Sequence, residues 1–144
     1  MVAVSAIYIW TTAHVRDELK AISQNRTELR AFADTDRWRV YLYEETLRRG
    51  LTYSDFRILR EVVQCESSWR QYRSDGQVIV SSGNIGLAQI NRFAHEAVYQ
   101  SMRLDPEIPE ENLSFAIYLY ERDGLAPWRL WSGWCWLPKV EKFL

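Results

Sequence analysis

The sequence is poor in cysteine, histidine and net charge. It contains two cysteines and two histidines, and its formal net charge at pH 7 is −1. None of these cysteines and histidines has the short spacing of a zinc ligand set, so we expect no metal and no cofactor. The charge supplies neither the basic surface that binds a nucleic-acid backbone nor a polybasic patch for an anionic membrane. Nucleic acid is therefore not an expected partner.

The apolar stretch over residues 2–10 is too short to cross a membrane. A transmembrane helix needs about 20 apolar residues, roughly twice this length. The stretch also lacks the basic flank and the small-residue cleavage site of a signal peptide. Two interpretations stay open: the end of a membrane anchor, which would allow membrane association, or a short buried helix.

The two cysteines, Cys65 and Cys135, are either two buried thiols or a disulfide. A bridge would close a loop of about 70 residues and stabilise the fold by roughly 4–5 kcal/mol on a chain-entropy estimate. It would also tie the residue beside Glu66 to the tryptophan-rich end of the sequence. Pairing would imply an oxidising compartment and hence an extracytoplasmic location.

Aromatic side chains are what the sequence has in excess. They make up 14% of the 144 residues, with seven Trp and eight Tyr. The length and a hydrophobic content of 47% suit one compact folded domain with a substantial core. So many amphipathic rings suit a core with oligomer contacts, and equally a surface that stacks against sugar rings.

Periodic apolar positions predict a mostly α-helical fold. A helix over roughly 13–33 suits either a short coiled-coil stalk or packing on its own domain. We expect residues 1–50 to form an N-terminal extension with one or two helices, and residues 51–144 to form the main domain. One helix is expected before the main domain, over 36–49. Within the domain we expect three helices, namely one from Thr52 or Ser54 to Glu66, one over 87–102 and one over 110–122. We also expect at most one small β-hairpin near 77–80 and an irregular aromatic tail.

Glu66 has a physical reason to be unusual among the acidic residues. Phe56, Leu59 and Val63 share one face of the predicted helix, and Glu66 falls three residues further along that face. This position places the carboxyl at the rim of the core rather than in solvent. Burial there would raise the carboxyl pKa and allow proton donation near neutral pH. A solvated surface charge is the alternative for an isolated Glu at a helix end.

Three features together resemble the goose-type-lysozyme and lytic-transglycosylase superfamily of murein-cleaving enzymes. They are Glu66-Ser67 at a helix end, the glycine- and glutamine-containing segment 83–91, and a later helix bearing Tyr118. The cysteine directly before Glu66 also looks like the start of resuscitation-factor-type domains. The resemblance covers roughly residues 52–136 and implies a lysozyme-like α+β domain that is mostly helical.

The resemblance implies that Glu66 is the general acid and base of a peptidoglycan lytic transglycosylase. It would protonate the oxygen between N-acetylmuramic acid and N-acetylglucosamine, and then accept the proton of the muramoyl C6 hydroxyl. That hydroxyl closes on C1 to give a 1,6-anhydro sugar, so one carboxylate suffices. Glycines for close approach or a sharp turn, amides for N-acetyl groups, and aromatic rings for sugar contact complete the expected site. The candidate substrate-binding residues are Ser67, Gly86, Gln89, Asn91, Tyr118, Trp128 and Trp131.

Three alternatives stay open. A hydrolytic muramidase of the same fold would need a second carboxylate roughly 5–9.5 Å from the first. Asp75 is the candidate, although Ser-Asp-Gly is typical of a turn. The Ala-Tyr-Asn-Ala-Gly motif of the superfamily is absent, which favours a catalytically weak glycan-binding or assembly module. A helical interaction domain without a glycan role would depend on residues 13–49.

Overall fold

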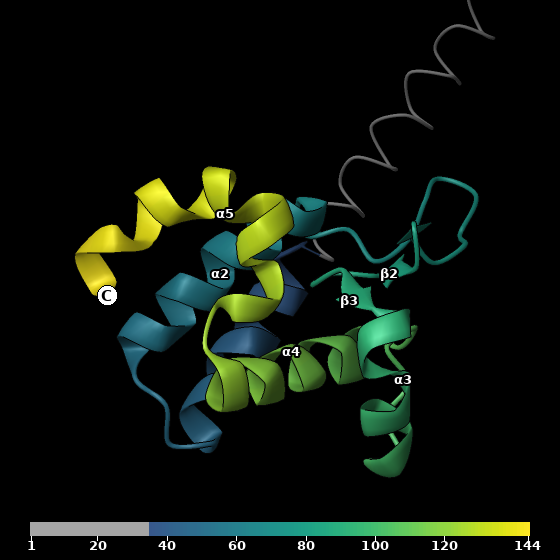
Figure 1. The fold of residues 1–144 in the computed structure, drawn as a ribbon, viewed down its shortest axis with the longest axis horizontal. Helices are drawn as coiled ribbons and strands as arrows, with labels where there is room; N and C mark the ends of the chain where they lie inside the picture. Colours follow the sequence, from purple (N-terminus) through teal and green to yellow (C-terminus); the bar gives the residue numbers. More distant parts are fainter. Residues whose placement is uncertain (1–34) are drawn as a thin grey trace, which may run out of the picture. The chain divides into compact units, whose positions relative to one another are not determined.

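The computed structural model describes residues 35–144, apart from the side chain of Trp131 (Figure 1). The predicted helix over 13–33 and the apolar stretch 2–10 lie outside the described residues. Residues 35–144 belong to one unit with a common core. Among them, no helix is long and apolar enough to cross a membrane.

Helix α2 (Tyr53–Ser67) carries Glu66 and begins with a capping box. The Thr52 Oγ1 accepts a hydrogen bond from the Asp55 backbone N–H at 3.2 Å, and Asp55 Oδ2 accepts one from the Thr52 N–H at 2.7 Å. These bonds satisfy backbone donors that a helix start leaves unpaired. At the other end Ser68 adopts a left-handed conformation (φ 53°), which stops the helix directly after the Glu-Ser pair. Thr52 is thus the cap, and the predicted helix is confirmed.

The helix over residues 35–48 packs alongside α4 (Pro109–Asp123). Two side-chain hydrogen bonds join them, from Arg37 to Glu110 (2.7 Å) and between Tyr41 and Ser114 (2.8 Å). Arg49, directly after the first helix, donates to Glu121 at 3.1 Å. The residue numbers rise together on both sides of these contacts, so the two helices run in the same direction. Trp38 and Leu42 of the first helix are buried in the common core. This helix is therefore an integral part of the described unit.

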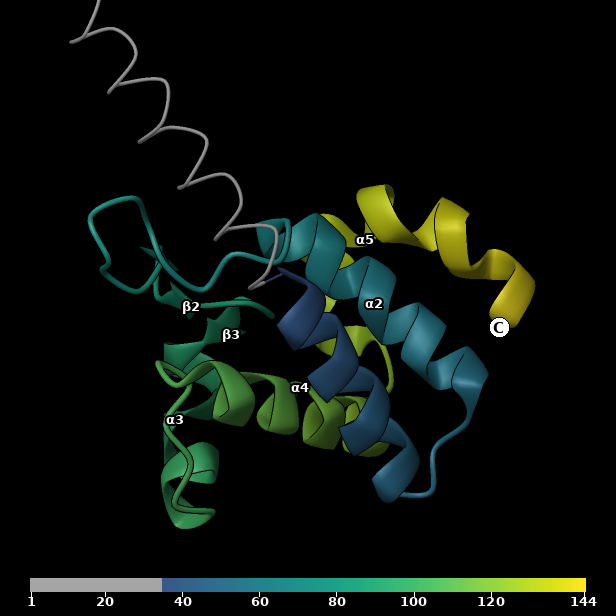
Figure 2. The same cartoon turned by 180° about the vertical axis from the view of Figure 1, so that it is seen from behind.

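A three-stranded antiparallel sheet lies after α2. Its strands are β1 (Val80–Ser81), β2 (Asn84–Ile85) and β3 (Ile90–Asn91), in the order β1-β2-β3. Val80 pairs with Ile85, which in turn pairs with Ile90. The expectation of at most one hairpin was wrong, because residues 84–91 form a second hairpin where a helix was predicted. In both cartoon views the sheet and α3 lie together, away from the C-terminal end of α5 (Figures 1 and 2).

The helix predicted to begin at Leu87 begins five residues later, as α3 (Arg92–Ser101). Gly86 (φ 66°) and Gln89 (φ 48°) have left-handed backbone conformations, which are incompatible with a continuous helix. Asn91 is the N-cap, and its Oδ1 accepts a hydrogen bond from the Ala94 N–H at 2.9 Å. The start of α3 is therefore fixed by Asn91 rather than by the glycines.

The aromatic tail is helical, which corrects the expectation of an irregular segment. Helix α5 (Ala126–Val140) is followed by the short 3₁₀ helix η1 (Glu141–Phe143). Glycine and proline within α5 weaken its intrinsic helix propensity. Packing along α2 compensates, with Trp128, Trp136 and Val140 buried. The mostly α-helical class is confirmed for the described residues, with the small sheet as its β component.

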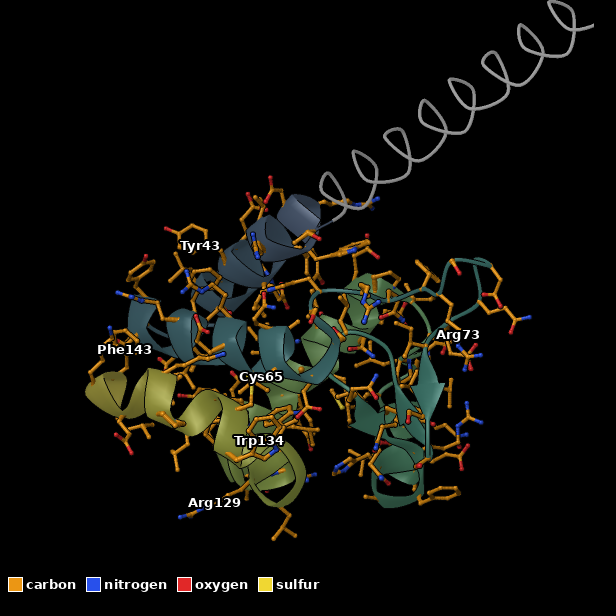
Figure 3. All side chains as sticks on the ribbon, turned by 90° about the horizontal axis from the view of Figure 1, so that it is seen from above. Tyr43, Cys65, Arg73, Arg129, Trp134 and Phe143 are labelled. Atoms are coloured by element: carbon orange, nitrogen blue, oxygen red, sulfur yellow. A yellow bond between two sulfur atoms is a disulfide. The ribbon has the colours of Figure 1, made fainter. Side chains whose placement is uncertain are left out.

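Cys65 and Cys135 form a disulfide between α2 and α5. This result settles the choice between paired and free cysteines. Figure 3 shows Cys65 on the side of α2 that faces α5. Disulfides of this kind are typical of proteins in oxidising compartments.

Candidate active site

A cavity of about 360 Å³ lies where the end of α2, the sheet, α3 and the start of α5 meet. Its polar wall consists of Glu66, Asn84, Gln89, Asn91 and His95. Its apolar wall includes Leu119, Pro127 and Trp128. A hollow that combines apolar walls with a few convergent polar groups is the usual form of a small-molecule site.

Glu66 is the one carboxylic acid among the described residues that line this cavity. Burial raises the pKa of Glu66 above its ordinary value, while a hydrogen bond from Ser132 acts in the opposite direction. The position near the C-terminal end of α2 also disfavours negative charge, since the helix dipole is negative there. Glu66 is therefore suited to holding a proton at a pH where exposed carboxyls have lost theirs.

Ser132 of α5 contacts the Glu66 carboxyl directly. Its hydroxyl donates to Glu66 Oε1 and lies 3.1 Å from the carbonyl oxygen of Trp128. The Trp136 indole N–H donates to the same hydroxyl oxygen at 3.0 Å. Trp128, Ser132 and Trp136 recur at intervals of four residues, so they form one face of α5 that meets the end of α2. Nothing in the sequence pattern pointed to Ser132, because the tail was expected to be irregular.

Two buried amides hold the loop that carries Gln89. The Leu87 N–H donates to Gln71 Oε1 at 2.8 Å, and the Ala88 N–H donates to Asn112 Oδ1 at 2.9 Å. Both amide groups also donate to backbone carbonyls, including that of Pro106. The buried N–H groups of the loop are thereby hydrogen-bonded, although the loop belongs to no helix or sheet that would pair them. Sequence reasoning missed both residues, although Asn112 occupies a buried position on the otherwise apolar inner face of α4.

Gly86→Ala should destabilise the protein by about 3 kcal/mol or more. An alanine Cβ there would lie 2.3 Å from Gln71 Oε1 and 2.7 Å from Asn112 Nδ2, and the left-handed backbone adds strain. Gly76→Ala is the matched control, because Gly76 has a similar backbone (φ 82°) but no atom within 4 Å of the point that an alanine Cβ would occupy. Its expected cost is about 1–2 kcal/mol. Urea unfolding of the two variants measures the difference, and equal losses would contradict the proposed packing of the amides.

Three predicted substrate-binding residues lie in the cavity with Glu66: Gln89, Asn91 and Trp128. The Gln89 side-chain amide donates to the Gly86 carbonyl at 2.7 Å. Asn91 uses its Oδ1 as the α3 cap and donates its Nδ2 to Asn84 Oδ1 at 2.9 Å. Trp128 is 4% exposed and donates its indole N–H to the Ala88 carbonyl at 2.9 Å. Trp128 therefore forms a fixed wall rather than an open stacking surface.

Other predicted residues lie elsewhere. Ser67 is buried and donates to the Val63 carbonyl at 3.4 Å. Gly86 is buried at the turn behind the loop and does not line the cavity. Tyr118 stacks on Phe115, with ring centroids 5.6 Å apart, and does not line the cavity. The side chain of Trp131 lies outside the described part of the structure.

Asp75, the candidate second acid, belongs to an exposed turn. Its Oδ1 accepts a hydrogen bond from the Gln77 N–H at 3.0 Å, as expected for an Asp that stabilises its own turn. It does not line the cavity. Trp69, which follows the end of α2, is 2% exposed and lies against the Arg39 guanidinium, so its ring offers no open face for sugar stacking.

His95 is a cavity residue that sequence reasoning did not select. It lies on α3, and its ring meets the Phe115 ring edge-on at 5.9 Å. Burial lowers the pKa of His95, and the positive charge of Arg122 lowers it further. The imidazole is therefore neutral at pH 7 and can offer the cavity one donor or one acceptor. An isolated histidine in an amphipathic helix carried no signal of this placement.

The chain matches no protein-family model, no curated protein and no solved structure. No group of three metal-binding side chains occurs among the described residues.

Proposed function

We propose that the protein is a peptidoglycan lytic transglycosylase that cleaves the β-1,4 bond between N-acetylmuramic acid and N-acetylglucosamine. The observation that carries the proposal is the cavity with Glu66 as its one carboxyl among the described residues, partly buried and with a raised pKa. A glycosidase that uses water normally needs a second carboxylate on the other side of the sugar. A transglycosylase does not, because its nucleophile is a hydroxyl of the substrate.

Glu66 would act first as the acid and then as the base. In the first half of the reaction its proton passes to the bridging oxygen, and the bond from that oxygen to muramoyl C1 breaks. In the second half the ionised Glu66 accepts the proton of the muramoyl C6 hydroxyl, whose oxygen bonds to C1. The products are a free N-acetylglucosamine hydroxyl and a 1,6-anhydro muramoyl end. Glu66 is protonated again, so the cycle is balanced without a cofactor.

The other cavity residues supply groups suited to an N-acetylated sugar. Asn84, Gln89 and Asn91 bring amide donors and acceptors to one wall, and neutral His95 brings a further polar atom. Leu119, Pro127 and Trp128 give an apolar wall for a sugar face or an N-acetyl methyl group. The disulfide supports an oxidising, extracytoplasmic location, where peptidoglycan is found.

Fragment analysis tests the proposal. Purified protein is incubated with peptidoglycan, and the soluble products are examined by mass spectrometry. We expect muropeptides with 1,6-anhydro muramoyl ends, which are lighter by one water than reducing ends. Reducing ends alone would contradict the transglycosylase proposal and indicate a hydrolytic muramidase. Absence of cleavage would favour a glycan-binding module without catalytic activity, and co-sedimentation with insoluble peptidoglycan would then test for binding.

The basic limb of the pH–rate profile should lie above the ordinary carboxyl pKa of 4.5. Glu66 must be protonated to start the reaction, so activity falls as pH rises through its pKa, which burial has raised. The measurement is kcat/KM for peptidoglycan solubilisation between about pH 4 and 9. His95→Asn serves as the control, since it removes the other titratable group lining the cavity while retaining Glu66. If the limb disappears in that variant, the titration belongs to His95.

A further inference from the structure

The hydroxyl of Ser132 is confined by three partners around a single oxygen atom. The indole N–H of Trp136 is a donor only, so at 3.0 Å it occupies a lone pair of Ser132 Oγ. The hydroxyl donates to Glu66 Oε1, and the Trp128 carbonyl oxygen, 3.1 Å away, is the third polar atom in contact with it. Ser132 is 8% exposed, so water has little access to the group. The hydroxyl is therefore a fixed donor directed at one oxygen of the carboxyl.

We propose that Ser132 is a positioning residue for Glu66, whose hydroxyl holds Oε1 so that Oε2 is the oxygen that exchanges a proton in the cavity. This inference rests on the proposed acid and base role of Glu66. An acid that must donate and accept at defined points benefits from one fixed rotamer and one defined proton-bearing oxygen. Oε1 can accept from Ser132 whether the carboxyl is ionised or carries its proton on Oε2, so the contact can persist through the cycle.

The contact with Ser132 also limits how far burial shifts the titration of Glu66. Hydrogen bonds to an ionised carboxyl are roughly twice as strong as those to a neutral one, so the Ser132 hydroxyl favours the charged form. The other groups near this point have different roles. His95 of α3 lines the cavity, and Lys139 of α5 lies 3.5 Å from the Cys65 sulfur rather than on the carboxyl. We therefore expect the loss of the Ser132 side chain to change the titration of Glu66 more than the loss of His95 or Lys139.

Ser132→Ala should lower kcat for peptidoglycan cleavage by roughly 10- to 100-fold, with KM changed less than about threefold. The midpoint of the basic limb should move upward, because the group that favoured ionised Glu66 is gone. Ser132→Thr keeps the hydroxyl and should restore the midpoint of the natural protein. Ser114→Ala is the matched control, since it removes the hydroxyl bonded to Tyr41 and neither residue lines the cavity, so both kcat and the midpoint should stay unchanged. A uniform loss of rate with an unmoved midpoint would overturn the proposal.

A direct titration separates this proposal from the proposed function. The side-chain carboxyl signal of Glu66 is followed by carbon NMR in the natural protein and in Ser132→Ala, with Glu66→Gln used to assign it. An upward shift of the titration in Ser132→Ala supports the contact even if the protein cleaves no peptidoglycan, in which case only the proposed reaction has failed. An identical titration overturns the inference even in an active enzyme. If Ser132→Ala does not fold, Trp136→Phe removes the indole donor that orients the hydroxyl and should shift the titration in the same direction by less, whereas no shift overturns the inference.

Discussion

Glu66→Gln should reduce peptidoglycan cleavage by about 10³-fold or more while the protein remains folded. Proton transfer by a positioned carboxyl is worth roughly 10²–10⁴-fold, and here one group performs both transfers. Glutamine has nearly the same shape, and its side-chain oxygen can still accept the hydrogen bond from Ser132. What is lost is therefore the exchangeable proton alone. Turnover is measured by solubilisation of labelled peptidoglycan and by the yield of anhydro muramoyl ends.

Glu61→Gln is the control for this variant. Glu61 is also a partly buried carboxyl on α2, where it pairs with Arg60 at 2.6 Å and lies away from the Glu66 cavity. It should retain activity close to that of the natural protein. Full activity in Glu66→Gln would remove Glu66 from the mechanism, and an equal loss in both variants would show that a general effect of charge or stability is being measured.

The same Glu66→Gln variant should be more stable than the natural protein at neutral pH. Because burial raises the pKa of Glu66 in the folded state, its contribution to folding is complete below the unfolded pKa and is lost as pH rises through the folded pKa. At pH 7 a carboxyl in the unfolded chain is ionised, and the raised pKa of Glu66 makes folding of the natural protein less favourable than it would be with an unshifted carboxyl. Glutamine has no such cost. Thermal unfolding should give a higher Tm for the variant at pH 7 and a gap that closes below about pH 4. A gap that is independent of pH would contradict the raised pKa.

Local patterns in the sequence were enough to predict the helix that carries Glu66 and the side of that helix on which it lies. The apolar spacing of Phe56, Leu59 and Val63 predicted both the helix and the side of it on which Glu66 lies. Gln89 and Asn91 were selected because they belong to the segment 83–91 that carries the resemblance and because their amides suit an N-acetyl group, and the cavity does bring them to Glu66. In each case the deciding information lies within one turn of helix or one short segment. Predictions from local sequence hold at these positions because the local preference and the tertiary packing favour the same structure.

The remainder of the site depends on contacts between distant parts of the sequence. Gln71 and Asn112 support the loop from positions 16 and 24 residues away from the N–H groups that they bind. Ser132 meets Glu66 across 66 residues. Apart from the apolar helix face on which Asn112 lies, nothing local distinguishes these polar residues from surface ones. The short aromatic tail was predicted to be irregular. Its glycine and prolines are poor helix formers, and packing on α2 overrides that propensity.

The replacement of both cysteines, Cys65→Ala with Cys135→Ala, should lower the free energy of unfolding by about 4–5 kcal/mol. The bridge closes a loop of about 70 residues, and its loss returns that conformational freedom to the unfolded chain. The lost energy is a large fraction of the roughly 5–15 kcal/mol typical of a whole domain. Urea unfolding measures this loss, provided that the free energy of unfolding depends on urea concentration with the same slope in both proteins. Intact mass with and without reductant checks that the natural protein contains the disulfide.

The disulfide should also matter for activity, because it joins α2 and α5 beside the proposed site. Cys65 precedes Glu66, and Cys135 follows Ser132 by three residues, so the bridge limits movement between the carboxyl and its hydroxyl partner. At a temperature where the double alanine variant is still folded, we expect kcat to fall by several-fold, and the pH midpoint to shift towards that of Ser132→Ala. A stable double variant with an unchanged midpoint would mean that packing of Trp128 and Trp136 alone holds the two helices in register. A large loss of stability with a shifted midpoint would mean that the bridge fixes the geometry of the acid as well as the fold.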